Sequence, residues 1–168
     1  MKVYLKSAVA IMILTLCTSC DNAPTAESTS ESQEKSFVKT SKEPTFYRSH
    51  EPKKQAAAFS DIVQVGDTYY LAGQIGMNHK TRTLVDETIE GQTKQTLENI
   101  KEVLAQHDLK MKDVVKATVI LDHIEDFQAF NKIYEQYFPQ KPARTTFAAE
   151  ALAAGALIEI EVVAVSQK

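Results

Sequence analysis

The segment Leu157–Val165 constrains the fold more than any other part of the chain. Its sequence, Leu-Ile-Glu-Ile-Glu-Val-Val-Ala-Val, is rich in β-branched residues and predicts a strand. Alternate residues of a strand share a face, so Glu159 and Glu161 lie in the same row as Leu157 and Val163. An unpaired carboxylate against a core is very costly. Two interpretations stay open: this face borders a cleft or subunit boundary that holds a partner for the carboxylates, or the strand is a solvated edge strand.

The other periodic segments predict an α+β fold. Further strands are expected over Asp61–Val65, Thr68–Gly73, Val114–Leu121 and Arg144–Phe147. Apolar residues at helical spacing predict one helix from Ile89 to about His107 and a second between Asp122 and Pro139. This order gives a single mixed β-sheet with both helices packed on one face.

Turn and cap residues sharpen this prediction. Gly66 and Asp67 suit a tight hairpin turn, because Gly adopts positive φ readily. No Gly follows the first helix, so we expect Asp108 to take the left-handed position there. Asp122, with Glu125 three residues later, predicts a capping box at the start of the second helix.

The first 20 residues are typical of an export signal. Lys2 and Lys6 precede an apolar core, Ala8–Leu16, which is too short to span a bilayer, since spanning takes about 20 residues. The following Cys17-Thr-Ser-Cys20 resembles a bacterial lipobox, although Cys17 stands where Leu is usual. We expect Cys20 to carry lipid and to anchor the exported protein to a bacterial membrane, on the periplasmic side or at the cell surface. The alternative is a plain secretory signal with an incidental cysteine.

The remaining chain divides into a tether and one domain. Residues 21–44 are rich in Ser, Thr and Glu and cannot bury enough apolar surface to fold alone. Residues 45–168 suffice for one domain that buries roughly two-thirds of its unfolded surface. They contain no cysteine, which excludes a disulfide framework, a cysteine-ligated metal and a cysteine nucleophile.

Net charge argues against nucleic acid as a partner. The chain carries 19 basic and 22 acidic residues, and Lys2 and Lys6 belong to the signal. The exported part then has 17 basic residues against 22 acidic ones, a net charge of −5. Such a surface does not attract phosphate backbones.

Two further polar residues stand among apolar ones. Asn131 lies four residues after Phe127 and three before Tyr134, which places it on the buried face of the second helix. It either ties a neighbouring loop or contributes to a site. Arg144 begins an apolar strand, where it can hold a carboxylate bidentately or form a salt bridge to Glu159 or Glu161.

The histidines do not predict a metal site. His50, His79, His107 and His123 are scattered along the chain without the spacing of metal ligands, so we expect surface residues.

In this order, these segments resemble the Rid (YjgF-type) family of reactive-intermediate imine/enamine deaminases. The resemblance covers roughly residues 45–166. It rests on Leu71–Gly76, Glu98–Val103, Val114–Val119, Asp126–Asn131, Tyr134–Phe138, Pro142–Thr146 and Ile158–Val165. The Pro-Ala-Arg tripeptide and the Ile-Glu-Ile-Glu strand are specific in combination.

The resemblance implies a homotrimer with a cleft between each pair of subunits. It also implies hydrolysis of 2-imino acids to 2-keto acids and ammonia without a cofactor or a metal. The family's carboxylate-binding arginine matches Arg144, and its water-orienting glutamate matches Glu159. Its glycine at the imine site matches Gly73, and its helix asparagine matches Asn131.

Three positions depart from the family pattern. Ala72 replaces a frequent Ser, Phe59 stands where a cleft Tyr is common, and Thr146 stands where some members have Cys. One or two hydrogen bonds to substrate are thereby lost, each worth roughly 0.5–1.5 kcal/mol. The alternative function is therefore non-catalytic binding of a small carboxylate in the same clefts. A third, the ribonuclease activity attributed to some relatives, fits the net charge poorly.

Overall fold

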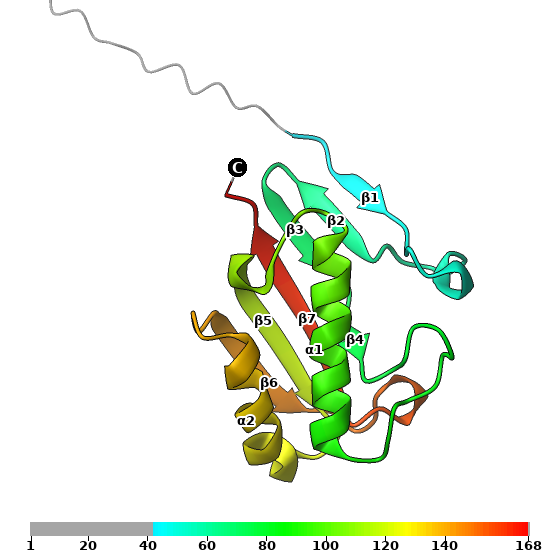
Figure 1. Cartoon of the computed structure of the whole chain (residues 1–168), viewed down its shortest axis with the longest axis vertical. Helices are drawn as coiled ribbons and strands as arrows, with labels where there is room; N and C mark the ends of the chain where they lie inside the picture. The colour runs from blue at the N-terminus through cyan, green and yellow to red at the C-terminus, as the bar shows by residue number, and fades with distance from the viewer. Residues whose placement is uncertain (1–41, 168) are drawn as a thin grey trace, which may run out of the picture. The chain divides into compact units, whose positions relative to one another are not determined.

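The computed structural model describes residues 42–167, which form one seven-stranded mixed sheet with two helices on one face (Figure 1). The strands are β1 (Thr45–Tyr47), β2 (Ile62–Val65), β3 (Thr68–Leu71), β4 (Gln74–Ile75), β5 (Val114–Leu121), β6 (Ala143–Ala148) and β7 (Ile158–Val165). The helices are α1 (Ile89–Ala105) and α2 (Phe127–Tyr137). Short 3₁₀ turns occupy Pro52–Lys54, Met111–Asp113, Ile124–Asp126 and Ala153–Gly155. The predicted fold class is confirmed.

The strand order is β1-β2-β3-β7-β5-β6, and β4 also pairs with β7. The β5–β6 pair is parallel and the other pairs are antiparallel. Strand β7 therefore lies inside the sheet, between β5 on one side and β3 and β4 on the other. The edge-strand interpretation of β7 is wrong, and its two glutamates need a different explanation.

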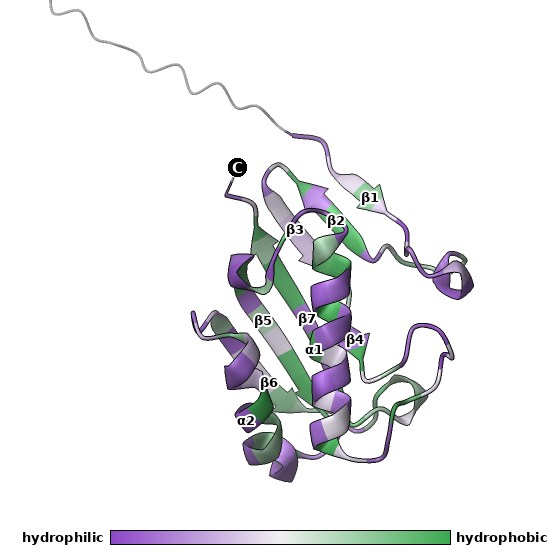
Figure 2. Cartoon of the chain, viewed as in Figure 1, coloured by the Kyte–Doolittle hydropathy of each residue, from purple (hydrophilic) through white to green (hydrophobic). Residues whose placement is uncertain are grey.

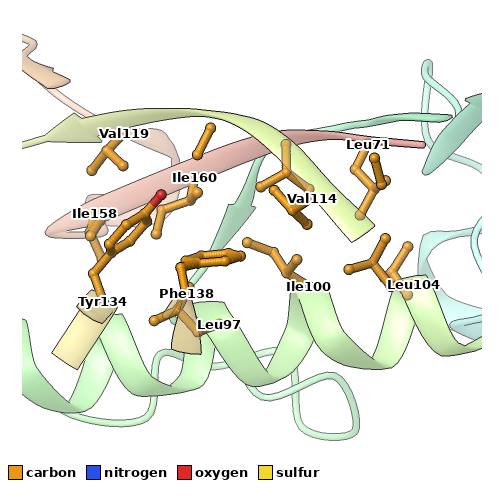
Figure 3. Packing of buried hydrophobic residues seen from close by; sticks show 14 of the residues in the cluster. Leu71, Leu97, Ile100, Leu104, Val114, Val119, Tyr134, Phe138, Ile158 and Ile160 are labelled. Atoms are coloured by element: carbon orange, nitrogen blue, oxygen red, sulfur yellow. The ribbon is translucent and has the colours of Figure 1, made fainter. Parts of the chain in front are cut away.

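The core lies between the helices and one face of the sheet. Alternate residues of β7, among them Ile158, Ile160 and Val162, are almost completely buried on that face. Figure 3 shows Leu97 and Ile100 of α1 pointing toward these strands. Figure 2 shows the same division, with polar residues on the outward turns of α1 and apolar ones along β7. Each fully buried side chain of this size contributes roughly 1.5–3 kcal/mol.

The turn predictions are confirmed. Gly66 has φ 63° in the β2–β3 hairpin, and Asp108 has φ 58° after α1. The prediction for the second helix is wrong in detail. The Ile124–Asp126 turn precedes α2, and no side chain caps either element. Asp122 cannot cap the helix because its N–H still donates to Leu157 O at 3.0 Å, which holds it at the end of the sheet.

Sequence periodicity missed β1 and β4. These strands have three and two residues, too few to show alternation. Ile124, which helical spacing assigns to the buried face, is 50% exposed in the turn before α2.

The predicted signal peptide, Cys20 and nearly all of the predicted tether lie outside the described residues. Residues 42–44 are exposed and have no regular structure. Between residues 42 and 167, the structure contains no helix with the length and apolar run that a membrane crossing requires.

Candidate functional site

Glu159 lies on the sheet face opposite the helices. Its neighbours across the sheet are Ile75 of β4 and Ile120 of β5. The side chain is half-buried, whereas Glu161 farther along the same row is exposed. A carboxylate therefore stands in an apolar row of the open face, as the first interpretation of this strand requires.

Gly73 makes room for the Glu159 carboxylate. A Cβ built at Gly73 would overlap Glu159 Oε1, and it would lie 2.7 Å from Glu159 Cδ. Any larger residue at position 73 must displace the glutamate. The two residues that the resemblance assigns to the imine site are thus in direct contact.

A cavity of about 230 Å³ opens beside Glu159. Its lining includes the predicted residues Gly73 and Phe59, and Phe59 is 55% exposed. Several polar lining residues are not among the candidates that the sequence pattern indicates: Lys54, His79, Arg82 and Asn99. The ammonium of Lys54 lies 5.5 Å from the centre of the Phe59 ring, which is a cation–π contact.

The environment of Glu159 alters its acidity. Burial raises the pKa of its carboxyl above the ordinary 4.5, and the neighbouring Glu161 charge raises it further. A carboxyl of raised pKa in a cavity is a candidate general base and acid.

Buried acidic residues form ion pairs with Lys54 and Arg82, the two cations that line this cavity. Glu51 is 2% exposed, and its Oε2 lies 2.7 Å from Arg82 Nη1. Lys54 Nζ lies 2.8 Å from Asp61 Oδ1 and 3.8 Å from Glu51 Oε1. These side chains come from the segment before β2 and the loop after β4, so sequence periodicity gave no signal for them.

Arg144 lies on the other face of the sheet, packed against α2. Its Nη1 donates to Asn131 Oδ1 at 2.8 Å, and Asn131 Nδ2 donates to Glu135 Oε1 at 2.6 Å. The guanidinium carbon lies 4.6 Å from the ring centre of Tyr134 and 5.2 Å from that of Phe130. Asn131 is partly buried, and its hydrogen bond brings these two sequence-predicted candidates into contact.

Arg144 also borders a second cavity, of about 380 Å³, together with Asn131 and Tyr134. Thr146, two residues along the same face of β6, has a buried hydroxyl with no hydrogen-bond partner among the described residues. Arg144 and Asn131 thus line a cavity on the α2 side of the edge strand, whereas Thr146 lies on the same face of β6 but does not line that cavity.

The two groups do not meet within one protomer. Arg144 pairs with Ala117 of β5, whereas Glu159 pairs with Ile120, whose partner on β6 is Phe147. Arg144 and Glu159 are therefore offset by three residues, about 10 Å along the strand direction, and they are two strands apart, about 10 Å across the sheet. The side chains also point to opposite faces. The alternative of a salt bridge between Arg144 and either glutamate is wrong for the single chain.

Ala72 stands beside the site rather than in it. Its N–H donates to Asp61 O at 2.9 Å, and its carbonyl accepts from Gln74 Nε2 at 3.3 Å. It adjoins Gly73 but does not line the Glu159 cavity. The hydroxyl that Ala72 lacks would therefore lie next to Gly73 rather than in the lining of the Glu159 cavity.

Three of the four histidines are partly buried and packed against other side chains, so the prediction of surface residues is wrong for them. His50 and His79 come together around Glu102, because the loop after β4 runs beside α1. His107 packs on Tyr47, with ring centres 4.5 Å apart, and burial lowers its pKa.

One missed residue did have a sequence signal. Asn99 lies four residues before Val103 on the apolar face of α1, the spacing that singled out Asn131. Its Nδ2 donates to Ile75 O at 3.0 Å and to Met77 O at 2.8 Å. The buried amide thus fixes the loop that carries the wall of the Glu159 cavity.

Known proteins resemble both the sequence and the fold. Residues 49–166 match the protein family described as Endoribonuclease L-PSP. The chain is 44% identical over 112 residues to a RutC family protein of Saccharolobus solfataricus, which covers 66% of this chain and 89% of the relative. It is 42% identical over 108 residues to the Homo sapiens protein named 2-iminobutanoate/2-iminopropanoate deaminase, covering 64% of this chain and 79% of the relative.

A solved structure extends this similarity. A Yersinia pestis protein of unknown function from the conserved Rid family matches with a TM-score of 0.69 and 34% identity, over 74% of this chain and 100% of that one.

Proposed function

The chain belongs to the Rid (YjgF-type) family, the family of its endoribonuclease L-PSP match, and on that premise we propose that it hydrolyses 2-imino acids to 2-keto acids and ammonia. Relatives at about 40% identity carry the name of that activity. The observation that carries the proposal is Glu159, a half-buried carboxyl of raised pKa that contacts Gly73 in a cavity.

The active form is a homotrimer whose sites lie between subunits. Glu159 and Arg144 occupy opposite faces of one protomer, so a substrate that touches both must lie between two copies. The open sheet face offers the surface for this contact. Exposed aromatic residues lie on it or at the β6 edge, with 66% of Phe46, 49% of Tyr70 and 45% of Phe147 accessible. Exposed apolar area of this kind marks an association surface.

Arg144 of the neighbouring copy holds the substrate carboxylate. Its guanidinium is fixed by Asn131 and by the rings of α2, so little side-chain entropy is lost when the carboxylate binds. This contact aligns the imine carbon with Glu159, and such alignment converts an encounter into a near-attack geometry.

Glu159 moves the proton that hydrolysis requires. The carboxylate takes a proton from water as the water oxygen bonds to the protonated imine carbon, and the C=N electron pair moves to nitrogen. The protonated Glu159 then donates to that nitrogen. As the C–N bond breaks, its electron pair leaves with the nitrogen, an oxygen lone pair forms the C=O bond, and the hydroxyl proton passes to the Glu159 carboxylate. This proton then goes to the released ammonia, so that a keto acid and ammonium leave. A positioned base of this kind contributes roughly 10²–10⁴ in rate.

The test is the rate of keto-acid release. A pyridoxal-phosphate dehydratase or an amino-acid oxidase generates 2-iminobutanoate and 2-iminopropanoate in situ, and keto acid is followed with and without the purified protein. We expect acceleration by the wild type, loss of it in Arg144→Ala, and retention in Lys132→Ala, an exposed cation of α2. No acceleration by a folded trimer would contradict the proposal.

The second candidate function is binding without turnover. Phe59 in the Glu159 cavity and Ala72 beside it lack hydroxyls that active relatives often have, which favours this alternative. Calorimetry then detects a bound 2-keto acid while the rate assay shows no acceleration.

Export and lipid attachment at Cys20 complete the proposal. The support is the sequence Lys2–Cys20 alone. We expect Cys20→Ser to release the protein from the membrane fraction of a bacterial host. Equal membrane association of the variant and the wild type would contradict lipid attachment.

A further inference from the structure

Three polar side chains from distant segments meet at the outer side of α1. His50 precedes the first 3₁₀ turn, His79 lies in the loop after β4, and Glu102 lies on α1. His50 Nε2 is 3.1 Å from Glu102 Oε1, and His79 Nδ1 is 3.1 Å from Glu102 Oε2. One nitrogen or oxygen of each residue lies within 4.8 Å of those of the other two.

We propose that His50, His79 and Glu102 bind one divalent transition-metal ion of the Zn²⁺ class. Ligand atoms of a tetrahedral zinc ion, each about 2.0–2.1 Å from the metal, lie roughly 3.3 Å from one another. Each imidazole nitrogen lies 3.1 Å from a different oxygen of the Glu102 carboxylate, close to this spacing. The ligand atoms of all three residues lie within 4.8 Å of one another, so binding requires the two imidazole rings to rotate toward a common ion. Glu102 is 53% exposed and can turn one oxygen toward that ion.

The donor set selects the kind of ion. Two imidazole nitrogens and one carboxylate oxygen suit Zn²⁺ and its neighbours Co²⁺, Ni²⁺ and Cu²⁺, whereas Mg²⁺ and Ca²⁺ prefer oxygen ligands. Three protein ligands leave a fourth position for water. A cavity of about 330 Å³, lined by all three residues, gives that position access to solvent.

Glu51 supports this assignment because it contacts His79 on the side away from Glu102. Metal-bound histidines commonly direct their second nitrogen to a carboxylate, which fixes the orientation of the ring. His79 Nε2 lies 3.4 Å from Glu51 Oε1, while its Nδ1 faces Glu102. Glu51 is almost completely buried and is itself held by Arg82, so its position is set before any metal arrives.

The metal would join two irregular segments to a helix. The region around His50 and the loop that carries His79 both border cavities, and His79 lines the Glu159 cavity as well. A bound ion thereby fixes one wall of that cavity without entering the hydrolytic chemistry.

Zinc binding tests the proposal directly. The full chain is used with Cys17→Ser and Cys20→Ser, because cysteine thiolates would bind zinc themselves. Equilibrium dialysis against ZnCl₂ with metal analysis gives the stoichiometry, and competition with a chelating dye gives the affinity. We expect one zinc per chain and a rise in the melting temperature with zinc concentration.

Matched variants assign the ligands. We expect His50→Ala and Glu102→Gln each to weaken zinc binding at least about tenfold, the scale of losses around metal sites. The exposed His123→Ala variant serves as the control and keeps the parent affinity. Glu102→Gln replaces an exposed side chain, so it tests the site even if His50→Ala fails to fold. A parent chain that binds no zinc, or variants that bind as tightly as His123→Ala, would leave only a hydrogen-bonded cluster and overturn the proposal.

Discussion

The Glu159 group and the Arg144 group are built by opposite means. Glu159 is a charge placed where its ionised form is disfavoured, since burial and Glu161 raise its pKa. Arg144 is a charge placed where it is held, on the aromatic rings of α2 and the Asn131 oxygen. One group is suited to exchange a proton and the other to fix an anion. The sheet thus places the proton-exchanging group and the anion-binding group on opposite faces, and the proposed trimer is the arrangement that would bring them together.

The largest expected effect separates these roles by kinetics. Glu159→Gln should lower kcat roughly 10²–10⁴-fold with little change in KM, because it removes the proton carrier and keeps the cavity. Arg144→Ala should instead act mainly through KM, raising it beyond the imine concentrations that the release assay reaches, because the carboxylate loses its anchor. Steady-state rates over a range of imine concentrations measure both, and equal effects on kcat and KM in the two variants would break the comparison.

A glycine substitution should affect only the Glu159 group. Because a Cβ at position 73 overlaps Glu159 Oε1, Gly73→Ala moves the carboxylate, and a displacement of about 1 Å can cost roughly 10²-fold in rate. Ala72→Ser is the matched neighbour and should keep or raise the rate. Undiminished activity of Gly73→Ala would show that the position of Glu159 is not critical.

Stability should depend on pH through Glu159. Its raised pKa means that the folded protein holds this proton more tightly than the unfolded chain does. The stabilisation is therefore present below the ordinary value of 4.5 and is lost as pH rises through the higher folded pKa. Glu159→Gln should melt at a higher temperature than wild type at pH 7, and the gap should close below pH 4.5.

Circular dichroism melts from pH 4 to pH 8 measure this difference. The exposed Glu150→Gln variant controls for loss of one negative charge. A melting temperature of Glu159→Gln that never exceeds that of the control would contradict the raised pKa.

The smallest effect should appear on the Arg144 side. Tyr137 Oη donates to Glu98 Oε1 at 2.7 Å and joins α2 to α1. Burial of the phenol, together with the hydrogen bond to Glu98 and the charge of its carboxylate, raises the Tyr137 pKa to about 12. Tyr137→Phe should lower the free energy of unfolding by roughly 0.5–1.5 kcal/mol and leave kcat unchanged. Urea unfolding measures it, and an unchanged midpoint would show that the bond is not stabilising.

The sequence predicted the elements in which apolar residues recur at a regular spacing. Strands β5 and β7 and both helices follow from apolar spacing, and the positive φ of Gly66 and Asp108 follows from local chemistry. Glu159 stood out for the same reason, as a charge in an apolar row. The burial of Glu159 could not be predicted. Gly73 and Phe59 line the same cavity but lie in other segments, and no sequence pattern indicates that these segments pack beside β7.

The cationic and histidine side chains around Glu51 could not be predicted from the sequence. Lys54, His79 and Arg82 lie in irregular segments, and only tertiary structure brings them to Glu51. The sequence singled out Arg144 as a candidate, but its face could not be assigned, since a one-residue change of register decides whether it faces α2 or the open side.

Mixing two inactive variants tests the shared site most directly. In trimers assembled from equal amounts of Arg144→Ala and Glu159→Gln, about one interface in four joins an intact Glu159 to an intact Arg144 in the head-to-tail arrangement of a ring. If each site is shared by two copies, the mixture should recover about a quarter of the wild-type rate. A mixture of confirmed mixed trimers that stays as inactive as either variant alone would contradict a site built from two copies.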